Sequence, residues 1–213
     1  MNLNKEVLDW LLQGDIAIRY QVYRDLLGDD KPGLRKRIAT EGWGLQFLGC
    51  RLANGHWGRS FYQPKWTSTH YTLLDLKNLN INQDNRLIRE TLQMVFDEEK
   101  GPDGGIKPIG IAGRSDVCVN GMALNYSPYF GMKEEVLKSV VDFILSQKMQ
   151  DGGFNCRSNG NGATHSSLHT TLSVLEGIME YRNNGCKYRL EELEKAEAAS
   201  REFILMHHLF RSD

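Results

Sequence analysis

The sequence lacks a long apolar run: none approaches the ~20 consecutive apolar residues that a membrane-spanning helix needs. It also lacks a dominant charge, because 26 basic and 27 acidic residues leave a formal net charge of −1. A chain with so little net charge has no global field that favours nucleic acid or an anionic membrane surface. We therefore expect neither a membrane span nor a nucleic-acid partner.

Cysteine is also scarce, and the four cysteines lack the Cys-x-x-Cys spacing of common metal and redox motifs. The N-terminal segment carries Lys5, Glu6 and Asp9 among its apolar residues, which is not the pattern of a secretory signal peptide. These features predict reduced thiols and a cytoplasmic location. Among the cysteines, the sequence assigns a functional role to Cys118 alone.

Convincing period-2 alternation is absent too, so β structure is expected to be minor or missing. What recurs instead is an apolar doublet every four residues, for example Leu87/Ile88, Thr91/Leu92 and Val95/Phe96, which marks one apolar stripe on a helix. We expect a single all-α domain over residues 1–213. Four helical hairpins are predicted near residues 16–27 and 34–50, 68–80 and 85–98, 117–130 and 133–148, and 167–182 and 189–210.

Three glycine-bearing loops show that the hairpins are repeats. Each loop ends in glycine, any residue and a large apolar residue, and these last residues, Trp57, Ile106 and Phe154, lie 49 and 48 positions apart. A hairpin of this length cannot bury its apolar stripe alone, so neighbouring repeats must stack. HEAT and armadillo arrays have repeats of similar length, but they lack glycine-x-aromatic loops between hairpins.

The segment from Phe143 to Phe154 resembles the QW motif of squalene and oxidosqualene cyclases, with Phe154 in place of the usual tryptophan. The same repeat occurs in protein prenyltransferase beta subunits. The resemblance implies an α/α toroid, in which inner helices surround a central cavity and outer helices surround them. Complete rings in this superfamily have about six hairpins. With four, this chain is expected to be a partial toroid, a form truncated at the C-terminus, or a ring completed by a second copy or a partner subunit.

The repeat places His70, Cys118 and His169 at equivalent positions, 48 and 51 residues apart, near the starts of three predicted inner helices. In a toroid these starts face one rim of the cavity, so the side chains can converge. Asp116 precedes Cys118 by two residues. Thiolate, imidazole and carboxylate are all ligand types that zinc prefers.

The resemblance to prenyltransferase beta subunits makes this expectation more specific. Those proteins hold zinc with an Asp-x-Cys pair at one inner-helix start and a histidine at the next, and the zinc activates a substrate thiolate. The matching positions are Asp116, Cys118 and His169. A plainer interpretation also fits the sequence: Asp116 shares its repeat position with Ser68 and Ser167, so helix capping alone can explain it, and Cys118 can be an inert buried cysteine.

Candidate substrate-binding residues follow from the same comparison. His70, Tyr71 and Arg114 loosely match positions that bind a diphosphate in the family, although the family's intervening lysine is absent. Trp66 and Tyr71 can stabilise a carbocation through their π faces, or they can simply pack. The Asp-x-Asp-Asp cluster that protonates substrate in squalene-hopene cyclases is missing.

Two functions therefore stay open. The first is a prenyltransferase-like or terpenoid-cyclase-like protein that binds an isoprenoid or similar apolar ligand in a central cavity, with zinc-assisted transfer. If this protein is an enzyme, we expect a transferase rather than a protonation-initiated cyclase. The alternative is a non-catalytic toroid that serves as a scaffold or binding protein.

Overall fold

The computed structural model describes residues 4–108, 114–156 and 162–211. Helices joined by loops make up this part of the chain, together with one isolated β-bridge between Lys100 and Ile106 and no strand. The predicted all-α fold is confirmed. Within the described ranges, no helix is both long enough and apolar enough to cross a membrane.

The N-terminal quarter of the chain forms an arm of short helices. They are α1 (Lys5–Leu12), α2 (Ile16–Gln21), the π-helical turn η1 (Val22–Leu26), α3 (Pro32–Arg37) and α4 (Gly42–Gly49). The helix predicted over 16–27 appears as α2 continued by η1. The helix predicted over 34–50 divides into α3 and α4, and α1 was not predicted.

The break between α3 and α4 is caused by Gly42, which has a φ of +58° that L side chains rarely adopt. The carboxylate of Asp15 lies directly above it: a Cβ on Gly42 would be 2.0 Å from Asp15 Oδ2. Asp15 accepts hydrogen bonds from the backbone N–H of Ala17 and of Trp43, each with a donor–acceptor distance of 2.9 Å. One carboxylate therefore joins the starts of α2 and α4, and this long-range contact ends the helix that periodicity alone predicts as continuous.

Three longer hairpins follow the arm. Their first helices are α5 (Thr69–Asn78), α7 (Val117–Tyr129) and α9 (Leu168–Asn183). Their second helices are α6 (Arg86–Glu98), α8 (Glu134–Ser146) and α10 (Leu190–Met206). The starts of α5, α7 and α9 are 48 and 51 residues apart. These bounds differ from the predicted ones by at most four residues at any end, because strong apolar periodicity defined each helix.

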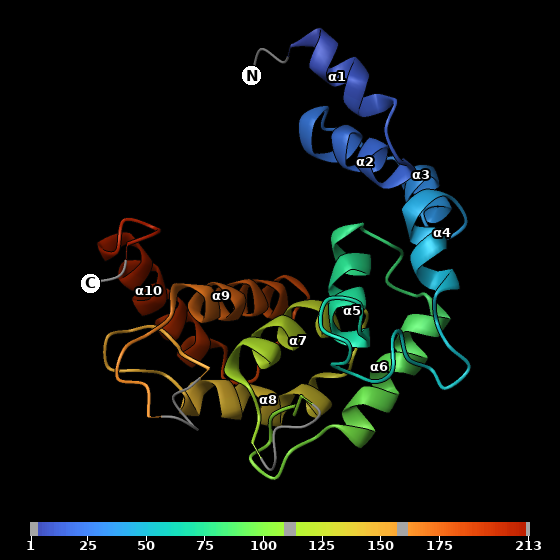
Figure 1. Cartoon of the computed structure of the whole chain (residues 1–213). Coiled ribbons are helices and arrows are strands. Elements are labelled where there is room, and N and C mark those ends of the chain that lie inside the picture. The colour runs from blue at the N-terminus through green and yellow to red at the C-terminus, as the bar shows by residue number, and fades with distance from the viewer. Residues whose placement is uncertain (1–3, 109–113, 157–161, 212–213) are drawn as a thin grey trace.

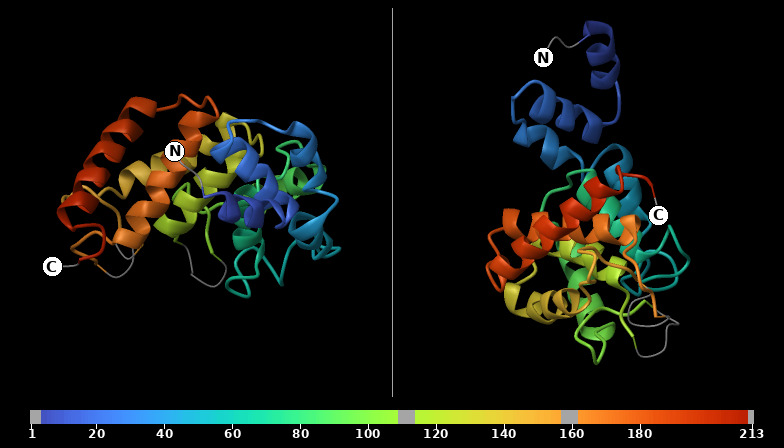
Figure 2. Two further views of the ribbon diagram at one scale, coloured as in Figure 1. Left: turned by 90° about the horizontal axis from the view of Figure 1, so that it is seen from above. Right: turned by 90° about the vertical axis from the view of Figure 1, so that its left-hand side faces the viewer.

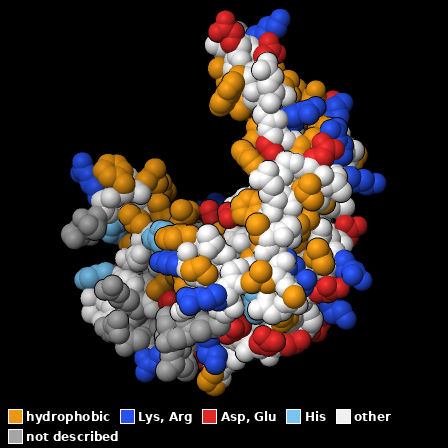
Figure 3. All heavy atoms as spheres, turned by 45° about the vertical axis from the view of Figure 1, so that its right-hand side comes forward, with side chains coloured by type: hydrophobic (Ala, Val, Ile, Leu, Met, Phe, Trp, Pro, Cys, Tyr) orange, Lys and Arg blue, Asp and Glu red, His pale blue; other side chains and the backbone are white. Residues whose placement is uncertain are grey.

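The hairpins lie side by side along an open arc (Figure 1). Helix α7 packs between α5 and α9, while α6, α8 and α10 cover the other side of the array. The arm α1–α4 stands away from this body, as the right-hand view of Figure 2 shows. A wide hollow separates the arm from the C-terminal end in the space-filling view (Figure 3).

The α7–α9 contact is close enough for the two backbones to meet. A Cβ on Gly177 of α9 would lie 2.4 Å from the carbonyl oxygen of Gly121 on α7. A Cβ on Gly121 would lie 2.8 Å from the backbone of Ser173. Since nothing larger than hydrogen fits at either position, these two glycines set the distance between α7 and α9.

Each repeat loop is held by the same polar clamp. The apolar residue that ends the loop is buried, and one side chain of the following helix accepts a hydrogen bond from its N–H and donates one to its C=O. The clamped and clamping residues are Trp57 with Thr69, Ile106 with Asn120, and Phe154 with Thr171. The repeat read from the sequence is therefore a structural unit, in which the motif's apolar residue belongs to the core.

A second contact fixes the glycine of each loop. A hydroxyl from the second helix of the hairpin donates a hydrogen bond of 2.8–3.0 Å to the glycine carbonyl oxygen. The pairs are Thr91 with Gly55, Ser139 with Gly104, and Ser200 with Gly152. All three glycines have φ between +86° and +96°. Each loop is thus tied to both helices of its hairpin, which gives the adjoining starts of α7 and α9 a defined position.

Candidate metal centre

Three potential metal ligands meet where the start of α7 lies beside the third repeat loop. Asp116 is the N-cap residue of α7, Cys118 is in its first turn, and Cys156 lies in the loop two residues after Phe154. One carboxylate oxygen and the two sulfurs all lie within 4.8 Å of one another. The three side chains are half-buried, so the group is reachable from solvent.

Cys156 accepts hydrogen bonds that favour its thiolate. The backbone N–H of Cys118 donates to its Sγ over 3.1 Å, and the hydroxyl of Thr170 on α9 donates over 3.3 Å. Hydrogen bonding from the Cys118 side chain is the largest influence that lowers the pKa of Cys156; the Thr170 hydroxyl and the Cys118 N–H lower it further. Of the two sulfurs, Cys156 is therefore the one whose thiolate form its surroundings favour.

The pKa values of the other two groups, Cys118 and Asp116, are raised. The pKa of Cys118 is raised by its hydrogen bond to Cys156, by burial and by the charges of Cys156 and Asp116. Burial raises the pKa of Asp116, while a hydrogen bond from Cys156 and the charge of Lys65 lower it. Three acidic groups in one place repel each other when ionised, and a divalent cation removes that repulsion.

Asp116 does not cap α7. Its backbone occupies the N-cap position, but its side chain accepts no capping hydrogen bond, whereas the equivalent Ser167 accepts one from the backbone N–H of Thr170. Ser68, at the third equivalent position, also makes no side-chain cap. Capping therefore does not explain an aspartate at position 116, and its carboxylate is directed toward the two cysteines instead.

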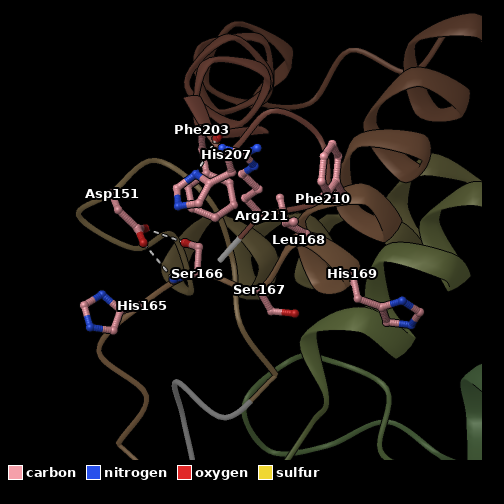
Figure 4. A pocket seen from close by; sticks show the side chains of 10 residues that line it. All are labelled: Asp151, His165, Ser166, Ser167, Leu168, His169, Phe203, His207, Phe210 and Arg211. Carbon is pink, nitrogen blue, oxygen red and sulfur yellow. Dashed lines mark hydrogen bonds between the residues drawn. The ribbon is translucent and has the colours of Figure 1, made fainter. Parts of the chain in front are cut away.

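Of the predicted ligand set, the structure brings Asp116 and Cys118 together, whereas His169 lies elsewhere. The side chain of His169 is exposed and lies outside the ligand group found among the described residues. It lines a cavity of about 590 Å³ beside the start of α9, where its ring points away from Asp151 and Ser166 (Figure 4). Asp116, Cys118 and Cys156 do not line this cavity.

Cys156 is the third member of the group, and few sequence features point to it. The residue belongs to a loop rather than a helix start, and the equivalent positions in the other loops are Arg59 and Pro108. The one sequence feature that indicates a role for Cys156 is its position two residues after Phe154, the apolar residue that ends the third repeat loop. Because Thr171 clamps Phe154 to α9, this stretch must pass close to the helix starts.

His70, which the sequence predicts to bind substrate, is a core residue in this structure. Its side chain is fully buried, and its Nδ1 lies 3.1 Å from the hydroxyl of Tyr126 on α7. Burial lowers its pKa to about 3, so the imidazole is neutral at physiological pH. A buried neutral ring presents no cationic surface to a diphosphate.

The other predicted substrate-binding residues lie near the cysteines. Trp66 is 67% exposed and its ring lies 4.9 Å from that of Tyr71, which shares a hydrogen bond of 2.9 Å with Tyr62. Burial raises the pKa of Tyr71, and so do the nearby charges of Cys118, Asp116 and Cys156. Arg114 is exposed two residues before Asp116. An aromatic face (Tyr62, Trp66 and Tyr71) therefore adjoins the ligand group.

Compared with protein-family models, curated proteins and solved structures, the chain has no match. The resemblance to prenyltransferases and terpenoid cyclases accordingly rests on the repeat loops and the Asp-x-Cys pair, and membership of that superfamily stays a prediction.

Proposed function

We propose that this protein binds zinc through Asp116, Cys118 and Cys156 and acts as a prenyltransferase-like transferase on an isoprenoid or similar apolar ligand. The observation that carries the proposal is the meeting of three ligand atoms within 4.8 Å around an aspartate that has no capping role. Two sulfurs and one carboxylate suit zinc better than magnesium or calcium, which prefer oxygen ligands alone.

Three protein ligands are the number typical of catalytic zinc sites, in which the fourth position is left to water or substrate. When bound, zinc would supply a Lewis acid that lowers the pKa of a thiol or water at that position. The chain's own residues keep the donors in place: Thr170 and the Cys118 N–H orient the Cys156 sulfur. The clamp on Phe154 fixes the loop that carries it.

The aromatic face supports an apolar ligand beside this site. Trp66 is 67% exposed although its ring packs against that of Tyr71, so the face offers apolar surface to solvent. The ammonium of Lys65 lies over the Trp66 ring, 4.8 Å from its centre, and adds a positive charge there. An apolar chain with an anionic head group matches this combination of aromatic surface and cation.

Cobalt(II) titration of metal-free protein tests the metal site, because cobalt reports its ligands by absorption. We expect one equivalent of Co²⁺ to give a thiolate-to-cobalt charge-transfer band and the visible bands of a tetrahedral ion. Asp116→Asn should weaken binding but keep the charge-transfer band, and Cys186→Ser should match the parent. Titration without a charge-transfer band would rule the site out.

Transfer activity is tested separately, by incubating the zinc-loaded protein with an isoprenoid diphosphate and a cysteine-containing peptide. Zinc-dependent thioether formation that is lost in Asp116→Asn and reduced in Trp66→Ala supports the transferase.

The non-catalytic alternative is favoured by one observation: the cavity of about 590 Å³ beside α9 does not include the ligand group. On that account, the protein binds its ligand away from the metal and uses zinc only to hold α7 against the third loop. Stoichiometric cobalt binding without thioether formation would support the alternative. A loss of stability on metal removal would show that the metal holds α7 against the third loop.

A further inference from the structure

We propose that Cys118 and Cys156 form a reversible disulfide, and that this bond and a bound metal ion exclude each other. The pairing itself depends only on the position of the two sulfurs. Its consequence for metal binding rests on the proposed function, because there the same sulfurs are ligands.

The two sulfurs are already neighbours. Both belong to the group whose ligand atoms lie within 4.8 Å of one another, and Cys156 Sγ lies 3.1 Å from the backbone nitrogen of Cys118. A disulfide needs a sulfur–sulfur distance of about 2.05 Å, which the side chains approach by rotation about their Cα–Cβ bonds. Cys118 lies in the first turn of α7 and Cys156 in a loop, so the disulfide would join a helix start to a loop.

The surroundings favour this pair over the other cysteines. Cys118 and Cys156 are half-buried, so small oxidants reach them while larger thiol proteins have less access. Cys50 is exposed at the end of α4, and Cys186 is buried in the loop between α9 and α10. Neither belongs to the group of three ligands.

A peroxide can supply the oxidising equivalents. One cysteine thiolate attacks a peroxide oxygen, the O–O bond breaks, and a sulfenic acid and hydroxide form. The second sulfur then attacks the sulfenic sulfur, which releases the oxygen as water. Overall, two thiols and one hydrogen peroxide give one disulfide and two waters, and a dithiol reductant reverses the change by thiol–disulfide exchange.

Oxidation would leave Asp116 as the only ligand of the group, and a single half-buried carboxylate does not hold zinc. Conversely, a bound metal ion occupies both sulfurs and protects them. The site would therefore have two states: two reduced cysteines with a bound metal ion, or a disulfide without metal. A reducing compartment keeps the first state, and oxidative stress favours the second.

Thiol counting by alkylation and mass spectrometry tests the pairing. Metal-free protein is treated with hydrogen peroxide under conditions that leave it monomeric. We expect a loss of two of the four alkylatable thiols, a mass decrease of about 2 Da, and a linked peptide pair containing Cys118 and Cys156. The double variant Cys50→Ser/Cys186→Ser should behave in the same way, whereas Cys118→Ser should form no intramolecular disulfide. Reduction with dithiothreitol should restore all thiols.

Metal binding is then measured on the oxidised protein. We expect the cobalt charge-transfer band to be absent after peroxide and to return after reduction, and we expect prior zinc loading to slow the thiol loss. Peroxide treatment that leaves both thiols free, or links either to Cys50 or Cys186, would overturn the proposal. So would an oxidised protein that still binds cobalt through thiolate. A disulfide between Cys118 and Cys156 in a protein that never binds metal would defeat the zinc function and the metal exclusion but keep the pairing.

Discussion

The backbone N–H of Cys118 donates a hydrogen bond to the sulfur of Cys156, although 38 residues separate them in the chain. The first N–H groups of a helix have no partner within the helix, and they attract negative charge. Asp116, the residue placed to accept such a bond, does not. The Cys156 sulfur thus supplies an acceptor to α7, which leaves the aspartate carboxylate directed toward both cysteines.

The polar clamps of the repeat loops should contribute measurably to stability. Thr171→Val keeps the shape of the side chain but removes the hydroxyl that binds the N–H and C=O of Phe154. The buried N–H of Phe154 would lose its partner, while its C=O keeps the hydrogen bond from the Ser167 N–H. We therefore expect a loss of about 1–3 kcal/mol in the free energy of unfolding, measured by urea denaturation. Thr40→Val is the matched control, since Thr40 is exposed. Equal stability of the two variants would show that the clamp contributes nothing.

The α7–α9 contact should not tolerate a methyl group. Gly177→Ala places a Cβ against the Gly121 carbonyl oxygen, and backbone atoms cannot rotate away as a side chain does. We expect a loss of about 1–3 kcal/mol and a lower melting temperature. Gly49→Ala, at a helical glycine with nothing within 4 Å, should instead raise stability by up to about 1 kcal/mol. A Gly177→Ala protein as stable as the parent would mean that the helices lie further apart.

Burial of His70 should make stability fall in mild acid. The unfolded chain takes up a proton on this ring below the ordinary pKa of 6.5, but the folded protein does so only near 3. The unfolded state therefore binds more protons between these values, and stability declines as pH falls from about 6.5, by at most about 1.4 kcal/mol per pH unit.

The groups that face the ring, the side chains of Tyr62, Tyr71 and Tyr126, stay neutral through this range because their pKa values are raised by burial. Urea denaturation between pH 7 and pH 5 measures the effect. His70→Phe should flatten the dependence, while His165→Gln, which changes an exposed histidine, should leave it unaltered. An unchanged slope in His70→Phe would mean that another group controls acid stability.

Periodicity predicted the helical hairpins well because each stripe, such as Ile88, Leu92 and Val95 on α6, packs against the core along its whole length. The loop spacing predicted the repeat for a related reason, since Trp57, Ile106 and Phe154 are core residues with the same backbone clamp. The division of the N-terminal helix was not predictable in this way. It depends on the contact of Asp15 with Gly42, which lies outside any local pattern.

The candidate site was predictable only in part. Asp116 and Cys118 are two residues apart, so helix-start geometry alone brings them together. Equivalent repeat positions did not predict equivalent surroundings. His70, Cys118 and His169 occupy the same position in their repeats, but they are respectively buried, half-buried and exposed. Loop lengths after the glycines differ between repeats, so equivalent positions do not face equivalent neighbours. Cys156 reaches the site through such a loop.

The most direct test of the account is the zinc content of protein purified without an affinity tag, compared between Cys156→Ala and His169→Ala. The account predicts one equivalent of zinc in the parent and in His169→Ala, and none in Cys156→Ala. Zinc retained by Cys156→Ala but lost from His169→Ala would contradict it, because the third ligand would then be the histidine that the structure places outside the group.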